Sequence, residues 1–226
     1  MSAVPPYVIL YRKKGGGVLI YLSETLPPEA AAYFEERGET VSFVRAGAAR
    51  GAVAAHPDIY LCRVGDELLR ASDDEVRGGY PQNAAFCALV LDGYFVHNLK
   101  ITAPRLLAAA ERAGLTPVSI RQGYAKCACA LVDGRSVITA DEGVARALEK
   151  LPGVSVLRVS PGHILLPGHA YGFIGGASAL LGKTLVFFGD ITAHPDCERI
   201  RGFAEARGVK LRWFPFPLAD HGGMVC

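Results

Sequence analysis

The chain has 226 residues, of which 50% are hydrophobic and 20% are charged, and its formal net charge is +2. This length supports one large domain or two small ones, and since no Ser-, Pro- or charge-rich linker divides the sequence, we expect a single domain over residues 1–226. The charges form no basic block, which argues against a nucleic-acid partner, and no apolar run is long enough to argue for a membrane span.

The N-terminal region predicts two strands, over residues 8–11 and 18–22, on either side of a basic, Gly-rich tip. A short helix over 28–37 follows, with Gly38 as its stop, and then a strand over 40–44. The order of elements is strand, strand, helix, strand, which we write as a β-β-α-β unit.

Residues 45–79 fit this pattern least well. We expect strands over 59–64 and 68–71, joined through Gly65-Asp66-Glu67, and a solvated acidic stretch over 72–75. We interpret this region as a divergent unit of the same kind.

Three clearer units follow, and in each a two-residue turn separates two apolar runs. The turns are Asp92-Gly93, Asp133-Gly134 and Gly182-Lys183, and Asp-Gly favours a type I′ hairpin turn, in which both central residues have positive φ. The expected strands cover 85–91, 94–96 and 117–120 in the first unit, 127–132, 136–140 and 154–159 in the second, and 176–181, 184–188 and 209–214 in the third.

The helices of these three units have recognisable starts. Thr102 and Asp141 are expected to cap the first two, because an oxygen in the side chain accepts hydrogen bonds from free amides of the first turn. His194-Pro195 is expected to open the third, since a proline at the first helical position loses no hydrogen bond. The segment 218–226 has no helix after it and would complete the N-terminal unit, which removes an exposed strand edge.

The units recur about every 40 to 50 residues, a period typical of repeat architectures. A ring of about five β-β-α-β units resembles the pentein fold. This is the α/β-propeller of guanidino-group-modifying enzymes, such as arginine and agmatine deiminases, dimethylarginine hydrolases and amidinotransferases, and of non-enzymatic ribosome-binding factors. We therefore expect an α/β fold, a single pentein-like propeller. An open sandwich of antiparallel sheet and helices is the alternative, and the hairpins disfavour an all-parallel sheet.

Three stretches carry a closer resemblance: Gln122–Asp141, Gly172–Gly176 and Gly189-Asp190. They look like an uncharacterised bacterial family assigned to the pentein fold, over roughly residues 55–225. Because that family has no established activity, the resemblance implies the fold and not a substrate.

In the pentein enzymes, a cysteine thiolate near the C-terminus attacks the guanidinium carbon, a histidine moves protons, and carboxylates hold the cation. The segment Gly222–Cys226 is similar to the Gly-Gly-x-Arg-Cys segment of arginine deiminases, which would make Cys226 the nucleophile. The sequence departs from this pattern, however. Val225 replaces the arginine, and the paired-acid motifs have no clear match. A terminal carboxylate would also raise the pKa of the Cys226 thiol, which disfavours a nucleophile. The alternative is that Cys226 is a terminal residue with no catalytic role.

Lys126 and Cys127 begin an apolar predicted strand, in which Cys127 and Cys129 share one face. Lys126 either lines a central pocket, where it would bind a carboxylate, or reaches solvent from the start of the strand. The two cysteines could supply half of the ligands of a metal site, but the sequence has no second pair with ligand spacing. We therefore expect core thiols and no metal. Cys127 is also the alternative nucleophile.

Other polar residues form weaker candidates. Asp220-His221 precedes two glycines and is either a site or a turn. Asp190 and His194 would bracket a pocket mouth, and the alternative for His194 is a helix cap.

His56-Pro57-Asp58 matches His194-Pro195-Asp196 as a tripeptide. The match either places polar side chains near the axis of the ring or reflects chance or the start of a helix. Asn83, just before a strand, is a further pocket candidate.

Two functions are open. In the first, an enzyme acts on a guanidino- or amino-acid-like molecule at the axis: Cys226 or Cys127 attacks, His194 or His221 moves protons, and Asp190 or Asp220 binds the cation. In the second, which the missing acid pair slightly favours, the protein binds a small polar molecule without chemistry. We expect no cofactor, and the oligomeric state is open. Six cysteines, mostly in apolar runs, and an N-terminus unlike a signal peptide favour a cytoplasmic protein.

Overall fold

The computed structural model describes residues 17–226 as a mixed α/β structure, so the strand expected over 8–11 lies outside the described residues. Within the described range, the strands form five small sheets. The helices are α1 (Pro28–Glu35), α2 (Pro57–Tyr60), α3 (Asp73–Val76), α4 (Pro104–Arg112), α5 (Glu142–Leu148) and α6 (Cys197–Glu205).

Three sheets share one topology: an antiparallel hairpin, a helix, and a third strand parallel to the second. The second strand is therefore central in each sheet, and the predicted β-β-α-β order of these units is confirmed. The strands are β5 (Leu89–Leu91), β6 (Tyr94–His97) and β7 (Thr116–Ser119); β8 (Cys129–Asp133), β9 (Ser136–Thr139) and β10 (Ser155–Arg158); and β11 (Ser178–Leu181), β12 (Thr184–Phe187) and β13 (Lys210–Arg212).

The other two sheets have two strands each. β1 (Leu19–Ser23) and β2 (Thr40–Val44) are parallel on either side of α1, whereas β3 (Leu61–Val64) and β4 (Glu67–Arg70) form a hairpin.

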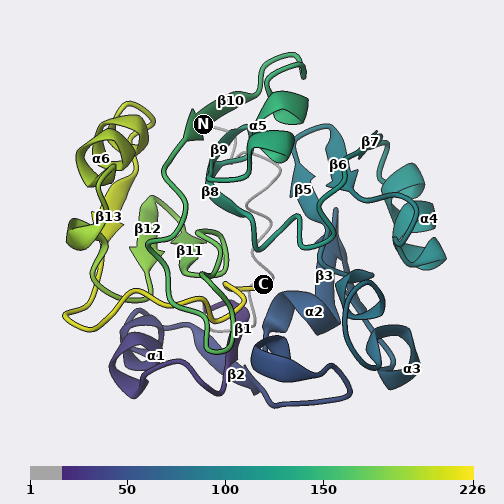
Figure 1. The fold of residues 1–226 in the computed structure, drawn as a ribbon, viewed down its shortest axis with the longest axis horizontal. Coiled ribbons are helices and arrows are strands. Elements are labelled where there is room, and N and C mark those ends of the chain that lie inside the picture. Colours follow the sequence, from purple (N-terminus) through teal and green to yellow (C-terminus); the bar gives the residue numbers. More distant parts are fainter. Residues whose placement is uncertain (1–16) are drawn as a thin grey trace.

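The C-terminal segment joins the first sheet. Tyr21 and Val225 exchange both backbone hydrogen bonds, at 2.7 and 3.2 Å, so the segment after residue 218 pairs with β1 as expected. Figure 1 shows the five sheets following one another around a common centre, and the chain ends near this centre in the view.

Apolar clusters lie between neighbouring sheets. β3 and β6 share one cluster, β6 and β8 a second, and β8 and β12 a third. β1 packs on β11 and β12 in a fourth cluster and on β3, through Tyr21 and Leu61, in a fifth. The order of contacts therefore leads from the last sheet back to the first.

Several local expectations were wrong. No described residue other than glycine has positive φ, so the Asp-Gly hairpins are not type I′ turns, and the second hairpin turns at Gly134-Arg135 and not at Asp133-Gly134. Ile59 lies in α2 and not in a strand, and α6 begins at Cys197 and not at His194-Pro195. Thr102 does not cap α4; its hydroxyl instead donates to the Asn98 carbonyl at 3.0 Å.

Other local expectations were confirmed. Asp141 caps α5 by accepting from the Val144 amide at 2.9 Å. Residues 72–74 of the acidic stretch are exposed as expected, although the stretch also forms the short helix α3, whose N-cap Ser72 forms a capping box with Glu75. None of the helices within residues 17–226 combines the length and the apolar character that a membrane crossing requires.

Candidate functional site

Four buried polar side chains from distant parts of the chain meet in one cluster. His56 is the N-cap residue of α2 and Asp58 lies in its first turn, while Cys127 lies in the turn before β8 and Asp220 in the C-terminal segment. Their exposed fractions are 2%, 1%, 2% and 4%. We call these four residues the central cluster.

The Cys127 sulfur lies at the middle of the central cluster. It is 2.7 Å from Asp58 Oδ2, 4.0 Å from His56 Nδ1 and 4.0 Å from Asp220 Oδ1. His56 Nδ1 and Asp220 Oδ1 are 3.7 Å apart. Since a thiol has one proton, the short contact to Asp58 is its hydrogen bond and the longer distances are contacts without one.

The two carboxylates differ in how well they are satisfied. Asp220 accepts hydrogen bonds from the backbone amides of Phe173 and Gly222, at 2.8 and 3.0 Å. Asp58 Oδ1 is buried and has no hydrogen-bond partner. Burial raises the pKa of both carboxyl groups, that of Asp220 to about 6. An unsatisfied carboxylate oxygen inside a protein destabilises the folded state. A cation or a hydrogen-bond donor beside Asp58 Oδ1 would remove this cost.

The thiol of Cys127 is held in its protonated form. Burial raises its pKa well above the usual value, and the neighbouring Cys87 and the charges of Asp220 and Asp58 act in the same direction. Reactive cysteines have electropositive surroundings instead. Cys127 therefore needs an added positive charge nearby before it becomes a thiolate.

Glycines allow the backbone to approach the central cluster closely. A Cβ atom on Gly176 would overlap Asp220 Oδ1. Gly222 has a φ of +76°, and a Cβ there would also overlap His56. Glycine at positions 176 and 222 thus lets the backbone lie directly against Asp220 and His56.

Less buried groups surround the central cluster. The positive charge of Lys126 lowers the pKa of Asp58 and Asp220, against the larger effect of burial. The charge of His169, an exposed residue, also lowers that of Asp220. His221 is half-buried, its Nδ1 lies 2.9 Å from Thr25 Oγ1, and burial with the charge of His56 lowers its pKa to about 4.

Tyr124 and Asn83 form a further polar pair. The Tyr124 hydroxyl donates to Asn83 Oδ1 at 2.7 Å, and burial raises the pKa of Tyr124 to about 12.

The structure brings five predicted site residues together: His56, Asp58, Lys126, Cys127 and Asp220. Lys126 and Cys127 lie in a turn, however, and not in the strand that we expected. His221 lies close enough for the charge of His56 to act on its pKa, whereas Asn83 is paired with Tyr124.

Asp190 and His194 make local contacts and are not part of the central cluster. Asp190 accepts from the amide and hydroxyl of Thr192 at 2.9 and 2.6 Å. His194 Nδ1 accepts from the amide of Asp196 at 3.1 Å, and its ring lies beside that of His163. Asp190 is the N-cap residue of a short 3-10 helix (Ile191–Ala193), and His194 follows that helix without capping α6, whose N-cap residue is Asp196.

Cys226, the predicted nucleophile, has an apolar environment. Its side chain packs against the apolar cluster of β1 and α1, and its backbone oxygen accepts a hydrogen bond from Arg63 Nε. Burial raises the pKa of its thiol. The thiol that meets the polar side chains is that of Cys127.

Sequence analysis missed Cys87 and His169. Cys87 lies in an apolar run, where a buried thiol is ordinary, and His169 lies in an irregular segment with no motif. The contact between Cys87 and Cys127 arises because the Lys126 amide donates to the Cys87 carbonyl at 3.0 Å.

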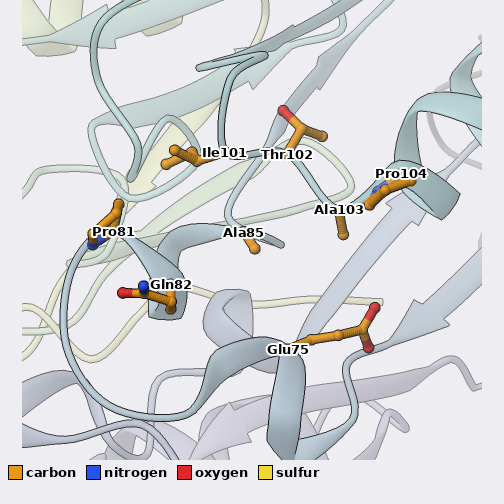
Figure 2. A pocket seen from close by; sticks show the side chains of 8 residues that line it. All are labelled: Glu75, Pro81, Gln82, Ala85, Ile101, Thr102, Ala103 and Pro104. Carbon is orange, nitrogen blue, oxygen red and sulfur yellow. The ribbon is translucent and has the colours of Figure 1, made fainter.

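Two hollows lie elsewhere. One, of about 320 Å³, has Glu75 and Ile101 on opposite sides in Figure 2, and apolar side chains such as Ala85 and Pro104 contribute to its wall. Glu75 is already bound there by Arg105, at 2.6 and 2.9 Å. The other, of about 470 Å³, is bordered by Tyr80 and by Asp141, whose carboxylate binds Gln122 and caps α5. Since the acidic groups of both hollows have partners, the central cluster is the better candidate.

Comparison with protein families gives one match, a family of unknown function (DUF6873), over residues 66–225. Cys127 and Asp220 lie inside the matched range, and His56 and Asp58 lie before it. Neither the curated proteins nor the solved structures contain a significant match. Because the match covers more than half of the chain, the chain belongs to the DUF6873 family of unknown function.

Proposed function

We propose that the protein binds a small organic cation, guanidino- or amino-acid-like, at the central cluster. The observation that carries the proposal is the unpartnered Oδ1 atom of Asp58. A guanidinium or ammonium group supplies both the donor and the positive charge that this oxygen lacks, and hydrogen bonds to charged groups are among the strongest in proteins.

The surrounding charges support the same ligand class. Asp58 and Asp220 are two buried carboxylates, and Lys126 is the cationic side chain whose charge acts on both. A bound cation would offset the second carboxylate. If the ligand is an amino acid, Lys126 is placed to bind its carboxylate, as an ammonium does in a partly buried site.

We also propose that the fold is a pentein-like propeller with the site at its axis. The repeated β-β-α-β topology, the apolar clusters between successive sheets and the pairing of Tyr21 with Val225 support this architecture. In a ring of repeats, side chains from different units converge where the units meet.

Thermal unfolding with a panel of ligands tests the binding proposal. Arginine, agmatine and a methylated guanidine are each added to the protein in the presence of a chelator, with urea-type and carboxylate analogues as neutral and anionic controls. At least one cation should raise the midpoint of unfolding, because a ligand that binds only the native state stabilises it. Equal shifts for neutral analogues, or no shift with any cation, would refute the proposal.

Hydrolysis is the second candidate function, and the contact of Cys127 with Asp58 and His56 favours it. Once a guanidinium is bound, its charge would favour the thiolate. The thiol would pass its proton to His56 or His221 as the sulfur bonds to the guanidinium carbon, and ammonia would leave with that proton. Water would then displace the sulfur, giving a ureido product and restoring the thiol.

Ammonia release from the bound cation tests this reaction. Cys127→Ala should abolish release, whereas Cys226→Ala should retain it. If ammonia release is lost in Cys226→Ala and kept in Cys127→Ala, the nucleophile is Cys226, as the resemblance implied. Binding without release leaves a binding protein that has the fold without the chemistry.

A further inference from the structure

The central cluster has a second feature, which is independent of organic ligands. His56 Nδ1, Cys127 Sγ and Asp220 Oδ1 all lie within 4.8 Å of one another, and all three residues are buried. We propose that these three side chains bind a divalent transition-metal ion, with zinc as the ion that fits best.

The separations of the three atoms are close to those of a tetrahedral zinc site. With bonds of roughly 2.0 to 2.3 Å, neighbouring ligand atoms around tetrahedral zinc lie about 3.3 to 3.8 Å apart. The three distances here are 3.7, 4.0 and 4.0 Å. A contraction of a few tenths of an ångström is enough to coordinate the ion, and side-chain torsions can supply it.

The types of ligand select the metal. One imidazole nitrogen, one sulfur and one carboxylate oxygen form a mixed set that suits zinc and its neighbours in the first transition row. Calcium and magnesium prefer six or more oxygen ligands and do not take a thiolate. A thiolate and a carboxylate also neutralise the two charges of the ion, which matters at a buried position.

Asp58 provides an observation that does not depend on the three ligands. Its Oδ2 accepts the hydrogen bond from the Cys127 thiol, and its Oδ1 is buried without a partner. When the metal binds, the thiol proton leaves to solvent, and the Asp58 carboxylate gains a cation in its immediate surroundings. Three protein ligands leave the fourth position for water, for a small molecule, or for Asp58 itself.

A competing set of ligands shares the same sulfur. Asp58, Cys87 and Cys127 also have ligand atoms within 4.8 Å of one another. The first set is favoured because it contains an imidazole, the commonest protein ligand of a transition metal.

Cobalt titration tests the proposal. The full chain is stripped of metal with EDTA, dialysed and titrated with Co²⁺, whose bond to a thiolate produces a charge-transfer absorption band. One equivalent should saturate the band, and Zn²⁺ should displace the cobalt. Cys127→Ser should abolish the band, and His56→Ala and Asp220→Asn should each weaken binding about tenfold or more. Cys197→Ser, which removes a buried thiol in α6, is the matched control and should change nothing.

Two results would overturn the proposal. The first is the absence of a thiolate band in the wild-type protein. The second is a band that Cys87→Ser removes and His56→Ala leaves intact, which would assign the ion to the competing set. If a variant fails to fold, X-ray absorption on the wild-type zinc protein decides, since the proposal expects one sulfur ligand and any other number contradicts it.

The metal proposal and the organic-cation proposal succeed or fail separately. Cobalt is titrated without organic ligand, and arginine or agmatine is titrated with a chelator. Cys127→Ser should lose the metal and keep the organic cation, because Asp58 and Asp220 remain.

Discussion

The Cys127 thiol donates a hydrogen bond of 2.7 Å to Asp58 Oδ2, across 69 residues of sequence. This bond links the turn before β8 to the start of α2, in two different units of the fold. It occupies one oxygen of Asp58 and leaves the other without a partner. The unpartnered oxygen lowers the free energy of unfolding, as is common for polar groups at binding sites.

Asp58→Asn should therefore leave the protein at least as stable as the wild type. An amide removes the cost of a buried carboxylate, and we expect the free energy of unfolding to rise by up to about 1 kcal/mol. Urea unfolding at neutral pH, without ligand, measures this difference. A loss of more than about 2 kcal/mol would mean that Asp58 has a native partner and would remove the main support for the binding proposal.

Gly176→Ala should destabilise the protein strongly. The new methyl group would overlap Asp220 Oδ1, and a clash that displaces a buried carboxylate costs about 2 kcal/mol or more. Gly79→Ala is the control, because nothing lies within 4 Å of its Cβ position, so its effect should stay within about 0.5 kcal/mol. Equal effects of the two changes would contradict the close approach at Gly176.

Glu75 should contribute to the pH dependence of stability. Hydrogen bonds from Arg105, helped by those from Ser72, lower the pKa of Glu75 from 4.5 to about 2. Because the folded pKa lies below the unfolded one, the stabilisation is fully present above about pH 4.5 and is lost as the pH falls towards 2.

Glu75→Gln should lack this contribution at neutral pH. Unfolding curves measured between pH 7 and pH 2.5 should therefore fall less steeply for the variant than for the wild type. Glu29→Gln, at an acidic residue in the first turn of α1, is the comparison and should follow the wild-type curve. Parallel curves for Glu75→Gln and the wild type would show that the ion pair with Arg105 does not form in solution.

Alkylation should modify Cys226 before Cys127. Cys127 is buried between two carboxylates, which disfavour its thiolate, whereas Cys226 is partly exposed. Iodoacetamide at neutral pH, followed by mass spectrometry of the peptides, gives the order of modification. Fast modification of Cys127 in the ligand-free protein would contradict both its burial and its protonated state.

The sequence was most informative where structure is local. The turns at Asp92-Gly93 and Gly182-Lys183 and the Asp141 cap depend on neighbours within a few residues, and all three were predicted. The middle hairpin turns at Gly134-Arg135, one residue later than expected. The turn at Cys127 was mistaken for a strand because its residues are mostly apolar. Distant hydrogen bonds support the turn: the Lys126 amide donates to the Cys87 carbonyl, and the Cys127 carbonyl accepts from the Gly176 amide.

The site was predictable only in part for the same reason. The tripeptides that begin at His56 and His194 look alike in sequence, yet the structure places the first in the central cluster and gives the second local contacts. The sequence around Cys87 contains no motif that marks it as a site residue. Its proximity to Cys127 arises from packing between two different units.

The central claim is that Asp58 holds a cation, and isothermal titration calorimetry with the best ligand of the thermal panel tests it most directly. The titration uses the wild type, Asp58→Asn, and Asp190→Asn as a control that removes a carboxylate with local partners. The account predicts equal affinity for the wild type and Asp190→Asn, and a dissociation constant about tenfold higher or more for Asp58→Asn, as expected when a charged hydrogen bond is lost. An Asp58→Asn variant that binds the cation as tightly as the wild type would contradict it.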